Sequence, residues 1–184
     1  PSPTSNPNFG NSSEIMKITK IDVFNFDLTY VHGTYIMSGG REITQLPSTL
    51  VRVSSDTGLF GWGEVCPLGT TYLPAHAAGA RAALELLAPA LIGLDPTNLA
   101  AINDAMDASL MGHAYAKSPI DVACWDLTGK AWGASVVEML GGVRQTKFPL
   151  YFAVPLGSPE EMTDYVHARR AEGIHRFQLK IGGD

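Results

Sequence analysis

The feature that most constrains the fold is a strand, a capped helix and a second strand near the carboxyl end of the chain. Residues 150–154 form a short apolar run, and residues 176–181 alternate polar with apolar side chains. Between them, residues 158–161 (Ser-Pro-Glu-Glu) supply an N-cap, a proline at the first helical position and a glutamate at the third, and Gly173 ends the helix. Strands joined by such a helix are parallel neighbours in one sheet. The sequence therefore predicts a βαβ unit.

A different order of elements precedes this unit. Residues 17–26 and 48–54 are predicted as strands, and the turn 56–58 (Asp-Thr-Gly) joins the second of them to a third strand at 59–65. Alanine-rich sequence follows, with apolar residues at three- and four-residue steps. The predicted helices are 75–87, 96–110, 115–132 and the short piece 135–140. Residues 30–45 are predicted as a long polar loop, and loops of this length are often lids or binding loops.

An antiparallel sheet with helices, followed by a β/α pattern, indicates two domains. We place the first at residues 16–146 and the second, cut short, at residues 147–184. Residues 1–15 are rich in Pro, Ser and Asn and have few core-forming side chains. We expect them to be a flexible tail or a leader, with Met16 as the natural start.

The composition favours a globular protein with a small-molecule partner. Hydrophobic residues make up 45% of the chain, which is enough for a real core. The 13 basic and 18 acidic side chains are scattered, so there is no basic footprint for nucleic acid or an anionic membrane. No apolar run approaches the ~20 residues of a membrane span, and we expect a cytoplasmic protein. Cys66 and Cys124 lie far apart and are expected to be buried or half-buried thiols, not zinc ligands.

Four segments resemble, in order, motifs of the mandelate racemase and muconate-lactonising branch of the enolase superfamily. They are Gly61-Trp62-Gly63-Glu64, the helical run 116–130 (AKSPIDVACWDLTGK), Met139-Leu140-Gly141-Gly142 and Gln178-Leu179-Lys180. The loop 66–74 resembles in particular that of members acting on proline betaines and hydroxyprolines. The resemblance implies an α+β capping domain (three-stranded antiparallel sheet plus helical bundle), followed by the first βαβ stretch of an incomplete TIM-type (β/α) barrel. It also implies magnesium-assisted removal of a proton alpha to a carboxylate.

Lys180 is the candidate catalytic base. On a strand, Phe177, Leu179 and Ile181 project to one face, while Gln178 and Lys180 project to the other. The polar pair then points into the barrel, near the strand end where the active sites of such barrels lie. The alternative from spacing alone is a surface lysine on an edge strand. Many relatives carry Lys-x-Lys here, and Gln178 in place of the first lysine weakens a cycloisomerase or dipeptide epimerase reading.

Tyr72 and Tyr35 are the candidate substrate-binding aromatics, together with Gln178. In relatives, the loops that carry the two tyrosines fold over the barrel mouth, and an aromatic face there would hold an ammonium group with ~2 kcal/mol when desolvated. The alternative is that Tyr72 packs under its loop with a wet hydroxyl. His32 and Arg41 on the first loop could also reach a substrate, although polar loop residues usually face water.

No carboxylate cluster for a metal is visible in the chain. Glu64, Asp121 and Asp126 are interpreted as structural, a hairpin-end contact and helix-surface pairs with Lys117 and Lys130. The Mg²⁺ ligands are expected beyond Asp184, so we expect the chain to be part of a longer protein and to be inactive alone. Two strands cannot close a barrel.

Three functions stay open on this basis. The first is racemisation or epimerisation of a proline-like amino acid or betaine, a small-molecule carboxylate, with Lys180 as one of two bases. The second is dehydration of a hydroxyproline or an acid sugar on the same scaffold. The third is a noncatalytic interaction module, for which replacing Lys180 would change nothing. We expect a homo-oligomer.

Overall fold

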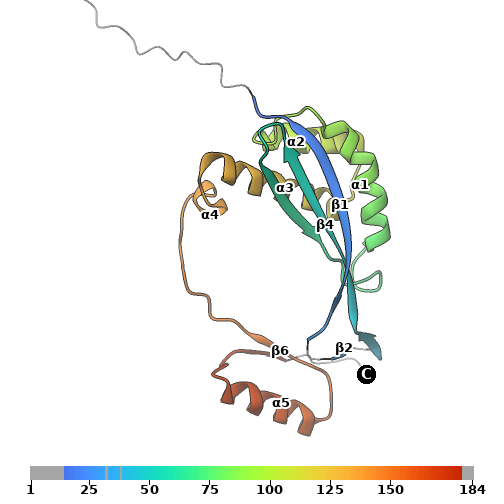
Figure 1. Cartoon of the computed structure of the whole chain (residues 1–184). Coiled ribbons are helices and arrows are strands. Elements are labelled where there is room, and N and C mark those ends of the chain that lie inside the picture. The colour runs from blue at the N-terminus through green and yellow to red at the C-terminus, as the bar shows by residue number, and fades with distance from the viewer. Residues whose placement is uncertain (1–14, 32, 38, 180–184) are drawn as a thin grey trace, which may run out of the picture.

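The structure is a computed structural model that describes residues 15–31, 33–37 and 39–179. The elements follow one another as β1 (Ile18–Thr29), β2 (Tyr35–Met37), β3 (Arg41–Ile43), β4 (Gln45–Ser55), β5 (Phe60–Val65), α1 (Ala77–Leu91), α2 (Leu99–Ser109), α3 (Ala114–Trp132), α4 (Val136–Met139), β6 (Phe152–Val154), α5 (Pro159–Ala171) and β7 (Phe177–Leu179). Strands with helices come first and a β/α pattern second, as predicted (Figure 1). None of the described helices is long and apolar enough to cross a membrane.

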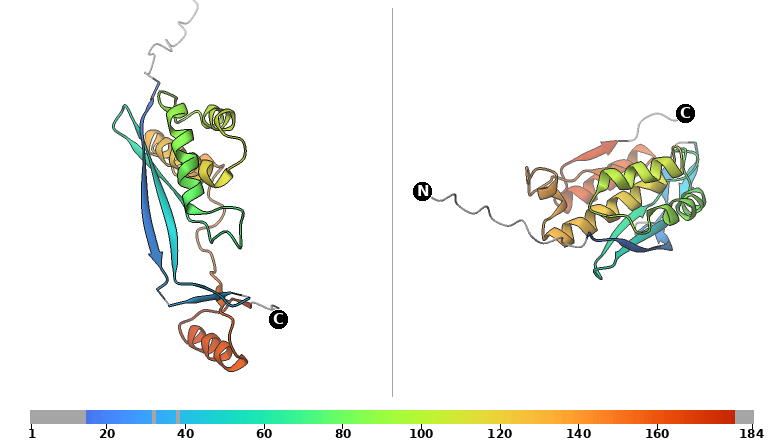
Figure 2. Two further views of the ribbon diagram at one scale, coloured as in Figure 1. Left: turned by 90° about the vertical axis from the view of Figure 1, so that its right-hand side faces the viewer. Right: turned by 90° about the horizontal axis from the view of Figure 1, so that it is seen from above.

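The first domain is an antiparallel sheet covered by helices on one face (Figure 2). The strand order is β1-β4-β5, with Val23 opposite Val51 and Val53 opposite Gly61. Because side chains alternate across a strand, Val51 and Val53 point the same way, and both are fully buried beneath the helices. The core is completed by apolar faces of the three longer helices, which include Leu84, Leu87, Ile102, Met106, Ile120 and Leu127.

Two glycines in β5 let the strand lie directly against α3. A Cβ on Gly61 would lie 1.9 Å from the carbonyl oxygen of Ala123, and one on Gly63 would lie 1.9 Å from that of Pro119. No side chain fits at that distance. Pro119 and Ala123 are about one helical turn apart, so the two glycines of the Gly-x-Gly motif lie against successive turns of α3. The motif recognised in the sequence is therefore a contact surface between strand and helix.

The prediction of a long loop at residues 30–45 is wrong in part. Strands β2 and β3 form a small antiparallel ribbon inside it, with Tyr35 opposite Ile43. Strands β1 and β4 also extend further than predicted, so that Thr29 pairs with Gln45. The added residues of β1 and β4 are held by backbone hydrogen bonds to the other strand. Such pairing leaves little trace in the alternation of side chains along the sequence.

The predicted helices are present in the structure, with shifted ends. α1 runs to Leu91, beyond the predicted end at Leu87, and includes Pro89. A proline in the last turn removes one backbone hydrogen bond, and the complete burial of Leu91 offsets that loss. α5 begins with the predicted capping box of Ser158 and Glu161.

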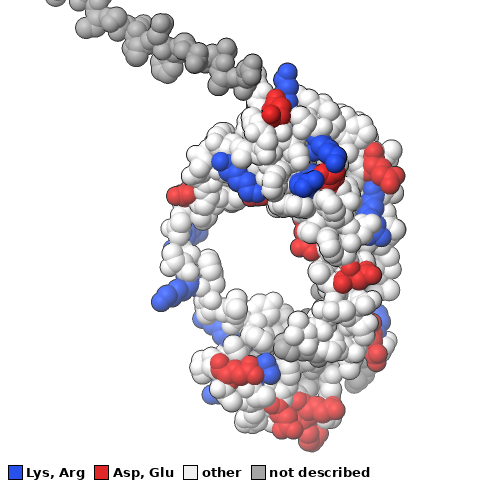
Figure 3. Space-filling view, in the orientation of Figure 1, with Lys and Arg blue, Asp and Glu red and all other residues white. Residues whose placement is uncertain are grey.

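The βαβ prediction is confirmed. β6 and β7 are parallel, with Ala153 opposite Gln178 and Val154 opposite Leu179. α5 connects the two strands, and a chain segment after α4 leads to them (Figure 1). Figure 3 shows Lys and Arg scattered among Asp and Glu on one face, with an opening between the helix-covered sheet and the βαβ unit.

Candidate functional site

The loops of the first domain approach the carboxyl end of β6. Pro155, Leu156 and Gly157 follow β6 directly and line a cavity of about 240 Å³ together with Ile36 of β2 and residues of α5. Because β6 and β7 are parallel, their carboxyl ends lie at the same edge. The β2–β3 ribbon is thus next to the edge where the active sites of β/α barrels form.

Gln178 lies on β7 and is exposed. Its neighbour Leu179 lines a cavity of about 280 Å³ with Met162 and Val166 of α5, which places Leu179 on the helix-covered face. Alternation then puts Gln178 on the opposite face, as the sequence predicts. Lys180, the candidate base, and His32 lie outside the described residues, so their predicted roles stay predictions.

Tyr35 is held in an aromatic stack that the sequence did not reveal. Its ring is 5.7 Å from that of Tyr30, and the two planes differ by 7°. Burial raises the pKa of Tyr30, and the nearby Tyr35 and Cys66 raise it further. Tyr30 therefore packs against the ring of Tyr35, which is half-buried.

Tyr72 lies in the segment between β5 and α1 and is 58% exposed. Its backbone N–H donates to the carbonyl of Gly69 at 3.2 Å, which forms a tight turn. Arg41 of β3 reaches this turn from the other loop, and its Nη1 donates to the carbonyl of Thr71 at 3.2 Å. In the described part of the chain, no hydrogen bond or ring contact joins Tyr72 to Tyr35 or to Gln178.

A wider cavity separates the two loops that carry these tyrosines. Its volume is about 370 Å³. The walls are residues 42–47 from β3 and the start of β4, residues 67–70 of the following segment, and His76 with Ala77 at the start of α1.

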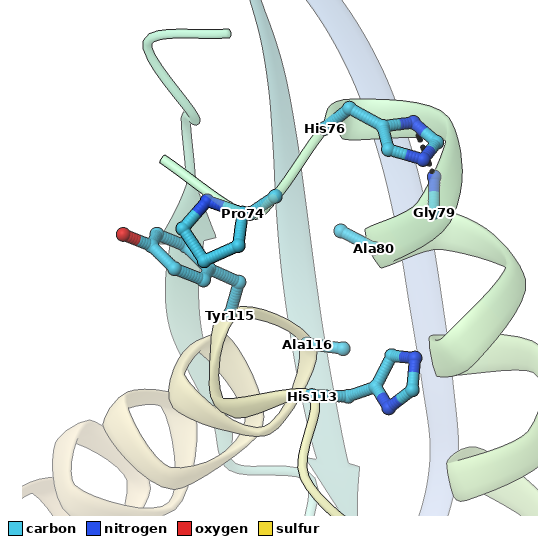
Figure 4. Close-up of a pocket in the computed structure, with 8 residues that line it drawn as sticks. Pro74, His76, Gly79, Ala80, His113, Tyr115 and Ala116 are labelled. Carbon is cyan, nitrogen blue, oxygen red and sulfur yellow. Dashed lines mark hydrogen bonds between the residues drawn. The ribbon is translucent and has the colours of Figure 1, made fainter. Parts of the chain in front are cut away.

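Two histidines meet at a smaller cavity of about 130 Å³ between the starts of α1 and α3 (Figure 4). His76 Nδ1 accepts a hydrogen bond from the N–H of Gly79 at 3.1 Å and so caps α1. His113 has a left-handed backbone with φ 55°, and its Nδ1–H donates to the carbonyl of Met111. The hydroxyl of Tyr115 points away from both rings (Figure 4). Each imidazole thus has one nitrogen engaged with nearby backbone.

His76 is the cap that sequence reasoning missed. Its place directly before the alanine-rich run is the N-cap position, but Ser, Thr, Asp and Asn are the usual caps there. The contact of Arg41 with Thr71 left a weaker signal, because it joins residues 30 positions apart in the chain.

The three acidic residues interpreted as structural are structural. Glu64 accepts a hydrogen bond from the hydroxyl of Ser48. Asp126 accepts one from the N–H of Trp62 at 2.8 Å and pairs with Lys130 at 2.7 Å, as predicted. Asp121 instead accepts from Asn103 of α2. Its predicted partner Lys117 pairs with Asp107, because α2 brings a carboxylate close to Lys117 from outside its own helix.

The two thiols are unsuited to metal or nucleophilic chemistry. Burial raises the pKa of Cys124 to about 12, and burial together with the charge of Glu64 raises the pKa of Cys66. Both therefore stay protonated near neutral pH. Within residues 15–31, 33–37 and 39–179, no group of three or more His, Cys, Asp or Glu could hold a metal ion. The described residues alone do not fit a magnesium site.

Comparison with known proteins identifies the architecture. The N-terminal domain model of the mandelate racemase / muconate lactonizing enzyme family matches residues 23–141. The chain is 50% identical over 169 residues to a cis-3-hydroxy-L-proline dehydratase of Roseibium aggregatum, which is 92% of the chain and 46% of that protein. It is 30% identical over 167 residues to an N-succinyl-L-Arg/Lys racemase of Bacillus cereus, or 91% of the chain and 45% of the racemase.

Solved structures agree. A member of the enolase superfamily from Roseovarius nubinhibens, complexed with magnesium, superposes with a TM-score of 0.83 at 40% identity over 92% of the chain and 45% of its own length. The N-succinyl Arg/Lys racemase of Bacillus cereus superposes with a TM-score of 0.86 at 30% identity over 91% of the chain and 45% of its own length. The chain thus spans about half the length of the relatives it matches.

Proposed function

The chain belongs to the mandelate racemase/muconate lactonizing enzyme family, and we propose that it is part of an enzyme that removes a proton alpha to a carboxylate and expels a β-hydroxyl as water. The proposed substrate is a cyclic β-hydroxy amino acid of the 3-hydroxyproline kind. The 50% identity to a cis-3-hydroxy-L-proline dehydratase supports this reaction. Of the activities that the sequence left open, dehydration therefore comes first.

The observation that carries the proposal is the meeting of the first domain with one edge of the β6–β7 pair. Ile36 of the β2–β3 ribbon lines a cavity with the residues that follow β6. Val154 at the end of β6 is paired with Leu179 of β7, the residue before Lys180. The β2–β3 ribbon therefore lies at the edge where β6 and β7 end, and we propose that the substrate is bound there.

Lys180 is the proposed base. Its Nζ takes the α-proton, the electrons of that C–H bond form the second bond between the α- and β-carbons, and the β-hydroxyl leaves as water with the proton that Nζ has taken. For this role, the pKa of such a lysine must fall from ~10.4 toward 7 or 8, through desolvation and a nearby positive charge. Gln178, on the face of β7 opposite Leu179, is proposed to contact the substrate carboxylate.

Tyr72 and Tyr35 are proposed to hold the ring ammonium group of the substrate. The exposure of Tyr72, at 58%, leaves its ring open to such a group. An ammonium ion over an aromatic face is stabilised by about 2 kcal/mol once water is excluded.

Magnesium is proposed as the cofactor, with ligands outside the described residues. Solved relatives include magnesium complexes. The ion would supply positive charge for the carboxylate during proton removal. The predicted homo-oligomer and cytoplasmic location also stay predictions.

Epimerisation is the second candidate. The N-succinyl-L-Arg/Lys racemase of Bacillus cereus matches 91% of the chain at 30% identity and shares its fold. Epimerisation begins with the same removal of the α-proton, but a second group returns a proton to the opposite face and no water leaves.

The test uses the full-length protein with cis-3-hydroxyproline in deuterated water. We expect loss of water to give a cyclic enamine, which becomes a cyclic imine as a proton moves from the ring nitrogen to the β-carbon. Nuclear magnetic resonance monitors the reaction. Deuterium at the α-carbon of an otherwise intact substrate would point to epimerisation instead.

Lys180→Ala should lower kcat by at least about 100-fold, since general bases contribute 10²–10⁴-fold. Lys147→Ala in the exposed linker is the matched control and should leave kcat unchanged. A Lys180→Ala protein with native turnover would remove the base assignment and favour the noncatalytic module.

A further inference from the structure

The two loops of the first domain are joined by one long side chain. Arg41, the first residue of β3, donates from Nη1 to the carbonyl of Thr71 at 3.2 Å, across 30 positions of sequence. Thr71 directly precedes Tyr72, the proposed substrate-binding aromatic. The hydrogen bond therefore acts on the backbone of the very turn that presents the Tyr72 ring.

The turn before Arg41 is shaped to hold its guanidinium. Gly39 and Gly40 have φ values of 74° and 68°, a left-handed conformation that glycine adopts without strain. A Cβ on Gly39 would lie 3.7 Å from Nη2 of Arg41, so the side chain lies back over its own turn. The ribbon thus directs Arg41 toward the second loop.

Among the described residues, the Arg41–Thr71 hydrogen bond is the one that joins the Tyr72 turn to the ribbon. The N–H groups of Tyr72 and Leu73 both donate to the carbonyl of Gly69, so these bonds are internal to the turn. Between residues 42–47 and 67–70 lies a cavity of about 370 Å³ instead of close packing. A hydrogen bond from a charged donor across such a gap fixes the separation of the two loops.

We propose that Arg41 is a positioning residue for substrate recognition, which fixes the Tyr72 turn relative to the β2–β3 ribbon so that the ring is already in place when the substrate ammonium group arrives. This inference rests on the proposed function for the identity of the substrate. Arg41 acts through Tyr72 and does not itself touch the substrate. Its loss therefore weakens binding and leaves proton removal unchanged.

The first experiment compares full-length Arg41→Met, Arg41→Lys and the control Arg144→Met, an arginine exposed in the linker. Arg41→Met should raise KM for the cyclic amino acid by about fivefold to tenfold, the usual net worth of one hydrogen bond in an exposed pair, with kcat within twofold. Arg41→Lys keeps one donor and should recover part of this loss. Arg144→Met should match the wild type.

A double-mutant cycle with Tyr72→Leu separates positioning from a general structural role. If Arg41 acts through Tyr72, Arg41→Met should change KM by less than twofold once Tyr72 is leucine. Effects of the two changes that multiply independently, or an unchanged KM in Arg41→Met, would overturn the proposal.

A second readout needs no turnover. Hydrogen–deuterium exchange at the amides of Tyr72 and Leu73 should be at least several-fold faster in Arg41→Met than in wild type or Arg144→Met, because the turn is released. Equal exchange rates in all three proteins would refute the role of Arg41 in holding the Tyr72 turn. A different result is a protein that neither dehydrates nor epimerises any cyclic amino acid and still shows faster exchange in Arg41→Met. That result would refute the proposed function and support the role of Arg41 in holding the Tyr72 turn.

Discussion

At the scale of single residues, the site depends on two glycines, which have no side chain, as much as on the side chains near it. Gly61 and Gly63 have no Cβ, and the carbonyls of Ala123 and Pro119 occupy the space where a Cβ would be. This close approach brings α3 onto the sheet. Because α3 begins next to the segment that carries Tyr72, the position of that segment depends on the two glycines.

We predict that Gly63→Ala lowers the free energy of unfolding by about 1–3 kcal/mol, the usual cost of an overpacked core. The added methyl group would lie 1.9 Å from the Pro119 carbonyl oxygen, and backbone must move to make room. Urea denaturation followed by circular dichroism measures the change. Ser54→Ala, half-buried on the neighbouring strand, should stay within about 0.5 kcal/mol of the wild type. Equal midpoints for the two variants would contradict this account.

At the scale of elements, α3 protects the free edge of β5. Asp126 accepts the hydrogen bond of the Trp62 N–H, and Lys130 donates to the carbonyl of Phe60. Both backbone groups point away from β4, where a further strand could otherwise add. The acidic and basic residues of one helical turn thus close the sheet, which explains why they accompany the Gly-Trp-Gly-Glu motif.

We predict that Asp126→Ala lowers stability by about 1 kcal/mol, since it removes a partly exposed charged acceptor and the partner of Lys130. The exposed β5 edge should also increase aggregation on partial heating, measured by light scattering. Asp104→Ala, an exposed carboxylate on α2, serves as the control and should change neither quantity. If both variants aggregate alike, α3 does not protect the edge.

At the scale of the whole molecule, the described residues form the first domain and the β6–β7 pair, and they contain no cluster of metal ligands. The first domain meets the β6–β7 pair around Ile36. No described cluster of His, Cys, Asp or Glu could hold a metal ion. The proposed reaction therefore requires metal ligands from outside the described residues.

We predict that the full-length enzyme loses turnover on treatment with EDTA and recovers it with added Mg²⁺. Because the described residues hold no metal cluster, the melting of the first domain, followed by the near-ultraviolet signal of its tryptophans, should shift little on chelation. Turnover that survives complete chelation would exclude magnesium from the proposed reaction.

The sequence by itself determined the order of elements, the capped βαβ unit and the family. These follow from local signals: the Ser158 capping box, the alternation around Gln178 and the glycine spacing of Gly61 and Gly63. It also identified Glu64 and Asp126 as structural. Local periodicity and capping are written in neighbouring residues, so they can be read without knowing what lies across the fold.

Only the tertiary structure decided the contacts between distant segments. The pairing of Thr29 with Gln45 and the hydrogen bond from Arg41 to Thr71 both depend on a partner from elsewhere in the chain. Lys117 shows the same limit, because its partner Asp107 comes from another helix and not from the next turn. A side chain chooses the nearest partner in space, and that partner is set by packing and not by sequence separation.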